Sequence, residues 1–513
     1  MTGPKWIGWR RSSSVAAPPP AVTRPRLVRA MGLLGLVATG VCSMVGAGIN
    51  VIPFMIQRNV PGIGGDVLPA FALAAVPAML AGLAYAILAS AMPRAGGSYV
   101  YASRALNPYL GFVASFSQWF SLCVAIGVVS YVLVPFLRDI ATALHWSGVA
   151  VALEAGSARV SISLGVLWAA VGLNLLGIRT YEKLIVPLMF LTFVLGGVVI
   201  VAGFSFDHAD FAAALQARDG QAVPAASAAR AGPGTFLSAA ALLFASFIGF
   251  DSIAQAGGEA RNPSRNLPLA IGVAVVSVGL FYMLFTAAVY HAVPWTYIAE
   301  QAVRRDLTAP GLLGYLLSPF WTVVIISGAA VALVKDLPAM LLAVSRLMFA
   351  WAEDGIFPAA VAAVHPVYRT PHTAILASGG MATLGILGSH LAGDFFLGVD
   401  ILVTSMLVNF ILMAISVLAL PVRNPDLARA VVVMPSRRVQ VPLVALGALG
   451  LAAFLVIHTV KDLSSPAAAW YFRSTPLWAL VMALGSLVYW REVRALRRAG
   501  VDLRARFATL PPE

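Results

Sequence analysis

The sequence predicts an all-α polytopic membrane protein, and three observations support this fold class. Of the 513 residues, 60% are hydrophobic and only 11% are charged, and the mean hydropathy is +0.88. Apolar runs of about 20 residues, the length that crosses a bilayer as a helix, recur along the chain. Proline, glycine and polar clusters separate these runs. A soluble domain could not bury so much apolar surface, so we expect the chain to lie in a membrane.

Twelve segments have the length and composition of spanning helices. The eighth is long enough to project beyond the bilayer or to bend. The expected spans are 32–56, 67–92, 109–137, 160–178, 184–205, 235–257, 267–291, 312–350, 373–391, 395–421, 440–460 and 475–490.

Lys and Arg are concentrated in alternate connections between these spans. The positive-inside rule then places both termini in the cytoplasm and the protein in the plasma (inner) membrane as a multi-pass chain. The same rule explains the net charge of +13, so we expect no nucleic-acid partner. The expected divisions are a disordered basic cytoplasmic tail (1–30), helices one to five (31–205), a polar extracellular loop (206–234), helices six to ten (235–421), helices eleven and twelve (422–490) and a cytoplasmic tail (491–513).

Two expected spans are interrupted at corresponding positions. The first has Gly46-Ala47-Gly48 near its middle, and the sixth has Ile248-Gly249-Phe250 directly before Asp251. Each is the first helix of a block of five. Glycines in membrane helices also serve helix packing, but interruptions at matching positions of two halves indicate the midplane binding site of a transporter.

Unwinding a helix in the bilayer frees backbone groups that must find partners. The half-helix after a break offers N–H groups and a positive dipole end, which suit a carboxylate. The half-helix before a break offers carbonyl groups, which suit an ammonium group. Two such breaks can therefore hold a zwitterion without a charged side chain.

Four sequence blocks, in order, resemble those of the amino acid–polyamine–organocation (APC) superfamily of permeases. The resemblance extends from about residue 31 to about residue 490. The blocks are "SMVGAGINVIP" in the first span, "AMPRAGGSYVYASRALNPYLGF" after the second, "FASFIGFDSIAQAGGEARNPSRNLPLAI" in the sixth and "SRLMFAWAEDGIFP" at the end of the eighth.

The resemblance implies a five-plus-five inverted repeat with broken helices 1 and 6, two peripheral helices, and secondary transport of amino acids or related amines. It implies that the backbone amides of Gly46, Ala47 and Gly48 bind the substrate carboxylate. The carbonyl groups of Ala245, Ser246 and Ile248 would receive the amine. The aromatic residues on either side of Gly249 would line or gate the pocket; these are Phe247 and Phe250.

The sequence departs from the superfamily pattern at several places. Asn50 replaces a phenylalanine, Gly258 replaces the first of two glutamates, and Glu353 replaces an arginine. The largest departure is in the eighth span, where Lys335 and Asp336 replace small polar residues that help to coordinate sodium in sodium-coupled relatives.

An ion within a membrane costs about 2.5–3.5 kcal/mol or more, so Lys335 and Asp336 are functional candidates. Adjacent residues on a helix point in different directions, so separate partners are expected. We hypothesise that the Lys335 ammonium group occupies the sodium position and ties the eighth helix to the carbonyl groups of the first break. It could also carry a coupling proton, or be a permanently charged structural tie to Asp251, Asp336 or backbone carbonyl groups.

Three further carboxylates are candidates for coupling or gating. Asp251 could cap the second half-helix, contact the substrate or relay protons, and capping with gating is favoured. Glu259, with Arg261 and Arg265, could form an ion-pair gate at the cytoplasmic end or lie in a solvated loop. Asp400, in the tenth span, has no evident partner in the sequence.

The sequence contains no hydrolase, metalloprotease or phosphate-binding motif, so we expect no enzyme activity. Two cysteines, Cys42 and Cys123, form no metal set, and no cofactor is expected. We predict a secondary transporter that moves an amino acid by alternating access, through proton symport or exchange rather than sodium coupling. Its partners would be the substrate, the lipid bilayer and protons. The alternatives are an amine or polyamine exchanger, which a carboxylate in the pocket would favour, and a membrane nutrient sensor, which a soluble domain would favour.

Overall fold

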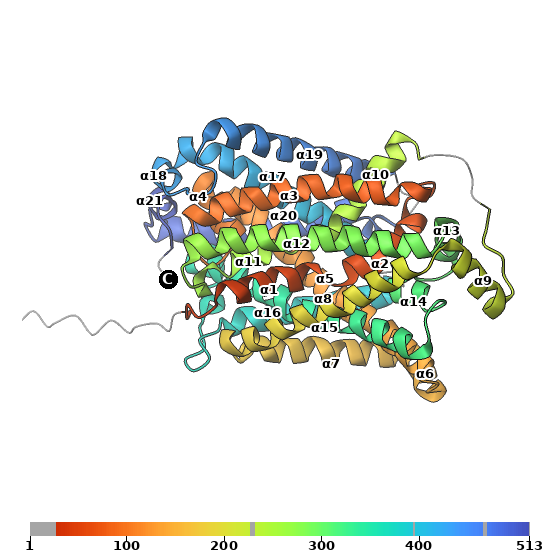
Figure 1. Cartoon of the computed structure of the whole chain (residues 1–513). Helices are drawn as coiled ribbons and strands as arrows, with labels where there is room; N and C mark the ends of the chain where they lie inside the picture. The colour runs from red at the N-terminus through yellow and green to blue at the C-terminus, as the bar shows by residue number, and fades with distance from the viewer. Residues whose placement is uncertain (1–26, 226–230, 393–395, 465–468, 512–513) are drawn as a thin grey trace, which may run out of the picture.

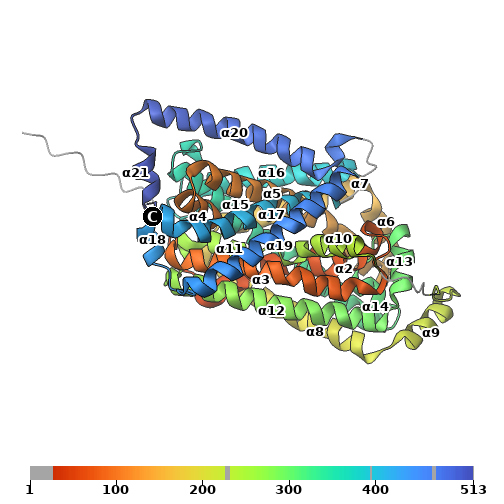
Figure 2. The same cartoon turned by 90° about the horizontal axis from the view of Figure 1, so that it is seen from above.

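The computed structural model describes residues 27–225, 231–392, 396–464 and 469–511. These residues form helices and no β-strand, with two isolated bridges that pair Met31 with Ala260 and Ala95 with Ala256. The long helices run side by side as one bundle (Figures 1 and 2). The predicted all-α class is therefore confirmed. Most of the predicted basic tail, residues 1–26, lies outside the described residues.

Ten helical segments of the described chain are long and apolar enough to cross a membrane. They comprise α1 (Leu33–Met44) with α2 (Ala47–Asn59), α3 (Val67–Ala91) with the short η1 (Gly64–Asp66), α5 (Pro108–Ala143), α7 (Gly156–Leu175), α8 (Ile178–Ser205), α12 (Pro263–Ala292), α15 (Pro319–Glu353), α16 (His372–Ala392), α17 (Phe396–Arg423) and α19 (Arg437–Leu463).

The sixth and twelfth predicted spans differ from these ten. The sixth is divided into α10 (Pro233–Leu243), the short η2 (Phe244–Phe247) and α11 (Asp251–Gln255), so no single helix covers it. The twelfth corresponds to α20 (Ser474–Arg498), which continues beyond the predicted end at residue 490 because the charged residues that follow still favour a helix. The remaining elements are α4 (Gly97–Ala105), α6 (Ser147–Glu154), α9 (His208–Asp219), α13 (Trp295–Arg304), α14 (Ala309–Leu313), α18 (Pro425–Arg429), α21 (Leu503–Ala508), η3 (Gly257–Glu259), η4 (Ala359–Ala362) and η5 (Trp470–Phe472).

The segment predicted as a polar loop, residues 206–234, contains the helix α9. Asp207 begins this helix with a capping box, since its side chain accepts the N–H groups of Ala209 and Asp210 at 2.8 and 3.0 Å. These two donors lower the pKa of Asp207. Local capping therefore produces a helix where composition alone indicated only polarity.

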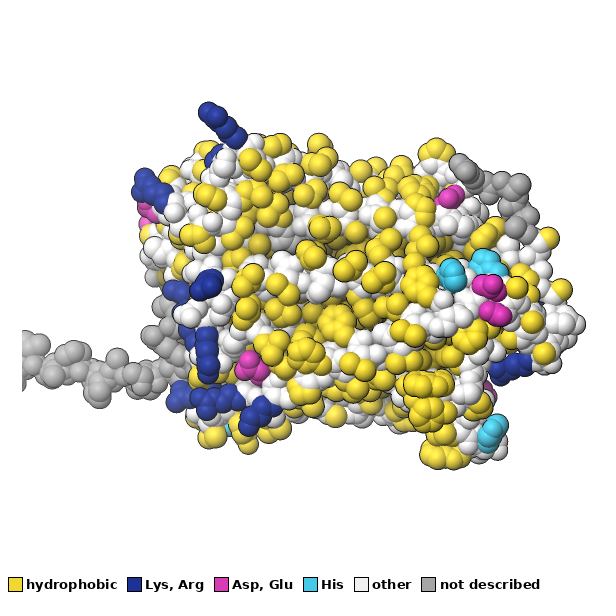
Figure 3. Space-filling view, in the orientation of Figure 1, with side chains coloured by type: hydrophobic (Ala, Val, Ile, Leu, Met, Phe, Trp, Pro, Cys, Tyr) yellow, Lys and Arg dark blue, Asp and Glu magenta, His cyan; other side chains and the backbone are white. Residues whose placement is uncertain are grey.

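The helix α5 lies at the centre of the bundle and packs against α15, α16 and α17. Peripheral helices instead expose large apolar side chains, such as Val194 and Val201 on α8 and Leu449 and Val456 on α19. The space-filling view shows a broad apolar surface along the bundle (Figure 3). This is the surface that a lipid bilayer covers.

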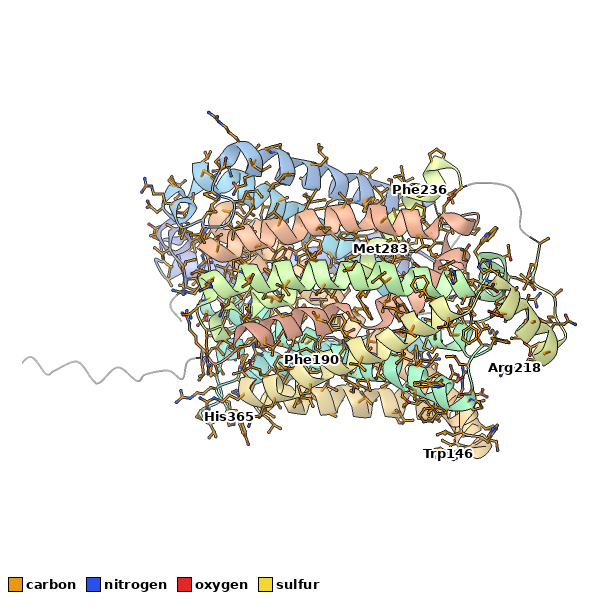
Figure 4. All side chains as sticks on the ribbon, viewed as in Figure 1. Trp146, Phe190, Arg218, Phe236, Met283 and His365 are labelled. Atoms are coloured by element: carbon orange, nitrogen blue, oxygen red, sulfur yellow. The ribbon has the colours of Figure 1, made fainter. Side chains whose placement is uncertain are left out.

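The two ends of the bundle differ in charge. Lys and Arg gather at the end where α1 begins and α21 lies, whereas His and acidic side chains appear at the opposite end (Figures 1 and 3). We call these the basic end and the far end. His365 lies at the basic end, and Trp146 and Arg218 lie at the far end (Figure 4).

Candidate functional site

The first span is interrupted between α1 and α2. The backbone leaves the helical conformation at Gly46, which has φ −143° and ψ −126°. Side chains from three helices bind the carbonyl groups that this break releases. The Tyr282 hydroxyl on α12 donates to Met44 O at 2.6 Å, and the Asn50 amide on α2 donates to Gly46 O at 3.1 Å.

Lys335, on α15, supplies the third set of donors. Its ammonium group donates to Val45 O at 2.5 Å and to Cys42 O at 3.3 Å, and the side chain is fully buried. The negative end of the α1 dipole faces this cation. The eighth span is therefore bound to the first break through a charged side chain.

The second break lies between η2 and α11. Gly249 has φ +134°, and a Cβ atom there would overlap the Ser43 carbonyl oxygen of α1. The Ser246 hydroxyl donates to Gly48 O at 3.3 Å. The two breaks, which are remote in sequence, are therefore in direct contact.

Asp251 has a different role from the predicted cap. Phe250 is the residue at the cap position of α11, and no side chain caps this helix. The Asp251 carboxylate instead accepts the Gly249 N–H at 3.2 Å, so it satisfies a donor within the break. Its other oxygen accepts the side-chain amide of Gln118 from α5.

Gln118 is the centre of a buried polar network that the sequence analysis missed. Its carbonyl oxygen accepts from Asn409 on α17 at 2.9 Å, from Gln255 on α11 at 3.2 Å and from Ser98 on α4. These side chains are buried. A glutamine in the middle of an apolar span was the available signal, because a buried amide in a membrane needs partners.

Asp336 follows Lys335 on α15 but points to a different place. Its side chain is 5% exposed and lies against Gly46, where a Cβ atom would overlap Asp336 Oδ2. Asp336 Oδ1 has no hydrogen-bond partner within the described chain. Lys335 and Asp336 do not form an ion pair within 4.0 Å in the described residues, as expected for adjacent helix positions.

A cavity of about 70 Å³ adjoins both breaks. Gly48, Ala245, Ile248 and Asp336, four of the predicted residues, contribute to its lining. The remaining wall is almost entirely apolar: Ser43, Met44, Val51, Ile52, Leu122, Ala125, Val128, Val129, Val132, Met340, Gly398, Val399 and Leu402.

The two predicted gating aromatics do not contribute to this lining. Phe247 packs against Phe71 and Tyr282, with ring centroids at 5.2 and 5.8 Å. Phe250 stacks on Phe410 at 5.1 Å. Both rings therefore pack against other aromatic side chains and do not line the cavity.

A wider cavity of about 750 Å³ opens at the far end. It shares Val51 and Val132 with the small cavity, so the two spaces adjoin. Charged side chains surround it, including Arg138, Asp139 and Arg159.

The basic end is closed by two buried ion pairs. Glu259 binds Arg346 through two contacts of 2.7 and 2.9 Å, and both side chains are 1% exposed. The predicted partners Arg261 and Arg265 are exposed, so that assignment was wrong. The polypeptide carries Glu259 inward on η3, where the helix α15 supplies the partner.

The second pair joins Arg104 on α4 to Asp354, with contacts of 2.5 and 3.0 Å. The segment that contains α21 covers this pair: Arg104 donates to Thr509 O at 3.1 Å, and its guanidinium group lies 4.9 Å from the Phe507 ring centre. The cavity at the breaks thus adjoins the far-end cavity, whereas buried ion pairs lie at the basic end.

Gly249→Ala should destabilise the folded protein. The added Cβ atom meets backbone rather than a movable side chain, and the left-handed φ adds strain of about 1–3 kcal/mol. Gly272→Ala on α12 is the matched control, since its Cβ position is open, and it should be neutral or slightly stabilising. Thermal unfolding of both purified variants measures the difference. Equal unfolding temperatures would contradict the close contact between the breaks.

Glu259→Ala should lower the free energy of unfolding by about 3–5 kcal/mol, because it leaves the Arg346 charge buried without a partner. Asp426→Ala removes a pair with Arg429 whose side chains are 87% and 79% exposed, and should change stability by no more than about 1 kcal/mol. Chemical unfolding of the two variants tests this contrast. A loss at Glu259 as small as that at Asp426 would contradict a buried ion pair with Arg346.

Comparison with known proteins gives the family. The sequence model of the amino acid permease family matches residues 31–484, which is most of the chain. The chain is 26% identical over 415 residues to a branched-chain amino acid permease of Bacillus subtilis, covering 79% of this chain and 83% of that protein. It is also 26% identical over 418 residues to the vacuolar cationic amino acid transporter 4 of Arabidopsis thaliana, covering 78% of this chain and 64% of that protein. The human cationic amino acid transporter 4 is 26% identical over 372 residues, covering 69% and 54%.

The family match confirms the resemblance found in the sequence blocks. It also agrees with the prediction of no enzyme activity, because the members of this family are transporters. The chain belongs to the amino acid permease family of the APC superfamily, whose members are multi-pass membrane transporters of amino acids.

Proposed function

We propose that this permease moves an amino acid by alternating access around its two broken helices. The observation that carries the proposal is the direct contact of the two breaks beside a cavity that adjoins the wider cavity at the far end of the described bundle. The backbone groups of a break offer a binding surface for a zwitterion. The buried ion pairs at the basic end are then the contacts that must open in the second half of the cycle.

The substrate carboxylate would bind N–H groups at the start of α2, at Gly46, Ala47 and Gly48. In this conformation the Gly46 N–H donates to Met44 O at 3.1 Å, so it would exchange that acceptor for the substrate. The substrate amine would bind the carbonyl groups at Ala245, Ser246 and Ile248, near the end of η2. The apolar wall favours an amino acid with an apolar side chain. The Bacillus subtilis relative is a branched-chain amino acid permease, which is consistent with this preference.

The wider architecture belongs to the same proposal. Residues 31–205 and 235–421 would form the five-plus-five inverted repeat, with α1–α2 and α10–α11 as the equivalent broken helices and 422–490 as the two peripheral helices. The basic end would face the cytoplasm of a plasma membrane, in accord with the positive-inside rule. The cavity would then face outward in this conformation.

Coupling would use protons or substrate exchange rather than sodium. The support is the Lys335 ammonium group, which donates to the carbonyl groups of Cys42 and Val45 at the first break. A cation position already filled by a side chain has no place for a sodium ion.

An amine or polyamine exchanger is a second candidate. The observation in its favour is the Asp336 carboxylate in the wall of the cavity, which would pair with an ammonium group. The two candidates differ in whether the ligand needs a carboxylate.

Uptake of an apolar amino acid should not depend on sodium. Purified protein in proteoliposomes should accumulate radiolabelled leucine at the same initial rate when NaCl is replaced by KCl or choline chloride. An inward proton gradient or internal amino acid should raise that rate. A strict sodium requirement would contradict the role given to Lys335, and uptake of amines alone would favour the second candidate.

Lys335→Met should abolish most uptake, because the Cys42 and Val45 carbonyl groups lose their donor in an environment without water, at about 1–3 kcal/mol for each unpaired group. Lys183→Met, at the basic side of α8 and away from both breaks, is the matched control and should retain uptake. The same proteoliposome assay compares them. Full uptake by Lys335→Met would show that this cation is not needed for coupling.

A further inference from the structure

The two charges of α15 lie on opposite sides of the break in the first span. The Lys335 ammonium group lies at the carbonyl end of α1, and the Asp336 carboxylate lies at Gly46, directly before the amino end of α2. Each charge therefore faces the end of a helix dipole that it stabilises. In this conformation, the two charges therefore stabilise the two helix ends at the break electrostatically.

Asp336 places a carboxylate beside the amino end of α2. The N–H groups in the first turn of α2, as in any helix, have no partner within the helix. Asp336 Oδ2 lies against this turn at Gly46. The side chain borders the cavity and is only 5% exposed to solvent. Its Oδ1 atom has no hydrogen-bond partner among the described residues.

An amino acid bound as proposed would bring a second carboxylate to the same end of α2. Two ionised carboxylates at close range in a site of low dielectric repel strongly, so both cannot remain charged there. The apolar wall offers no other cation, since Lys335 is directed to the carbonyl groups on the other side of the break.

We propose that Asp336 takes up one proton when the amino acid carboxylate binds, and releases it when the amino acid leaves. This inference rests on the proposed function and names the group that couples proton and substrate. A solvent acid gives up the proton, so its O–H bond breaks as a new O–H bond forms on an Asp336 oxygen. Lys335 keeps its charge throughout as the fixed tie to α1.

The surroundings of Asp336 contain few other groups that titrate. Lys335 lies beside it on α15, Cys42 interacts with it from α1 and Tyr282 from α12. The parts of α5, η2 and α17 that line the cavity carry no ionisable side chain. Asp251, the other carboxylate at the breaks, is directed to Gln118 and to the Gly249 N–H.

The test compares leucine with isoamylamine, which is leucine without its carboxylate, by calorimetric binding to the purified permease from mildly acidic to mildly alkaline pH. We expect leucine affinity to fall by about tenfold for each pH unit once Asp336 is ionised in the free protein, which is the linkage of one proton. Isoamylamine should show the opposite slope, because its ammonium group binds the ionised carboxylate.

Asp336→Asn should bind leucine with an affinity that no longer changes with pH, since asparagine resembles the protonated acid. Asp251→Asn is the matched control and should keep the pH slope, whatever its affinity. A slope that survives in Asp336→Asn, or disappears in Asp251→Asn, would overturn the assignment to Asp336 while leaving amino acid transport in place.

A measurement on the unaltered protein guards against a misfolded variant. Calorimetry of leucine binding in buffers of different ionisation enthalpy should report uptake of one proton for each leucine above the pH at which Asp336 ionises. Leucine binding without proton uptake there would overturn this inference alone. Failure of every amino acid tested to bind at any pH would overturn both this inference and the proposed function.

Discussion

Carbonyl groups at the end of α1 have no helical partner, and the interior of a bilayer offers them no water. Their donors come from Lys335 on α15 and Tyr282 on α12. These bonds join the first broken helix to elements of the second half of the chain. The close approach of Gly249 to Ser43 then becomes possible, because the two interrupted backbones are held at the same depth. The cavity beside the breaks is a result of this requirement, since only an unwound segment leaves room beside it.

The ends of the bundle are closed and open for different physical reasons. At the basic end, two pairs of opposite charges are buried, and such pairs add little net stability because their desolvation offsets their attraction. Apolar residues of similar size would close this end equally well. Unlike charged side chains, they would gain no favourable hydration when they separate. At the far end, charged side chains line a cavity of about 750 Å³ that adjoins the small cavity at the breaks. Ion pairs at the basic end can be exchanged for contacts with water at low net cost, which would suit the alternating access proposed above.

Much of the fold could be predicted because the membrane restricts it to helices of known length. The breaks were also predictable, since Gly46 and Gly249 stand where an apolar helix should continue. The hydrogen-bond and ion-pair partners of the site residues could not be predicted. Glu259 was assigned to the nearby Arg261 and Arg265, but the packing of α15 on η3 supplies Arg346 instead. The Gln118 network joins four helices, and its composition depends on their rotation about their axes. Asp251 was expected to cap α11, yet the unwound backbone presents the Gly249 N–H to it first.

The neighbouring charges of α15 also affect how the protein is assembled in the membrane. Each of Lys335 and Asp336 costs about 2.5–3.5 kcal/mol when a lone helix enters the bilayer. That penalty is relieved only where α1 and α2 already present their free ends, because these supply the acceptors for Lys335 and the positive dipole for Asp336. The eighth span therefore depends on the first for stable insertion. Membrane insertion of the second half of the chain therefore depends on a correctly formed break in the first span.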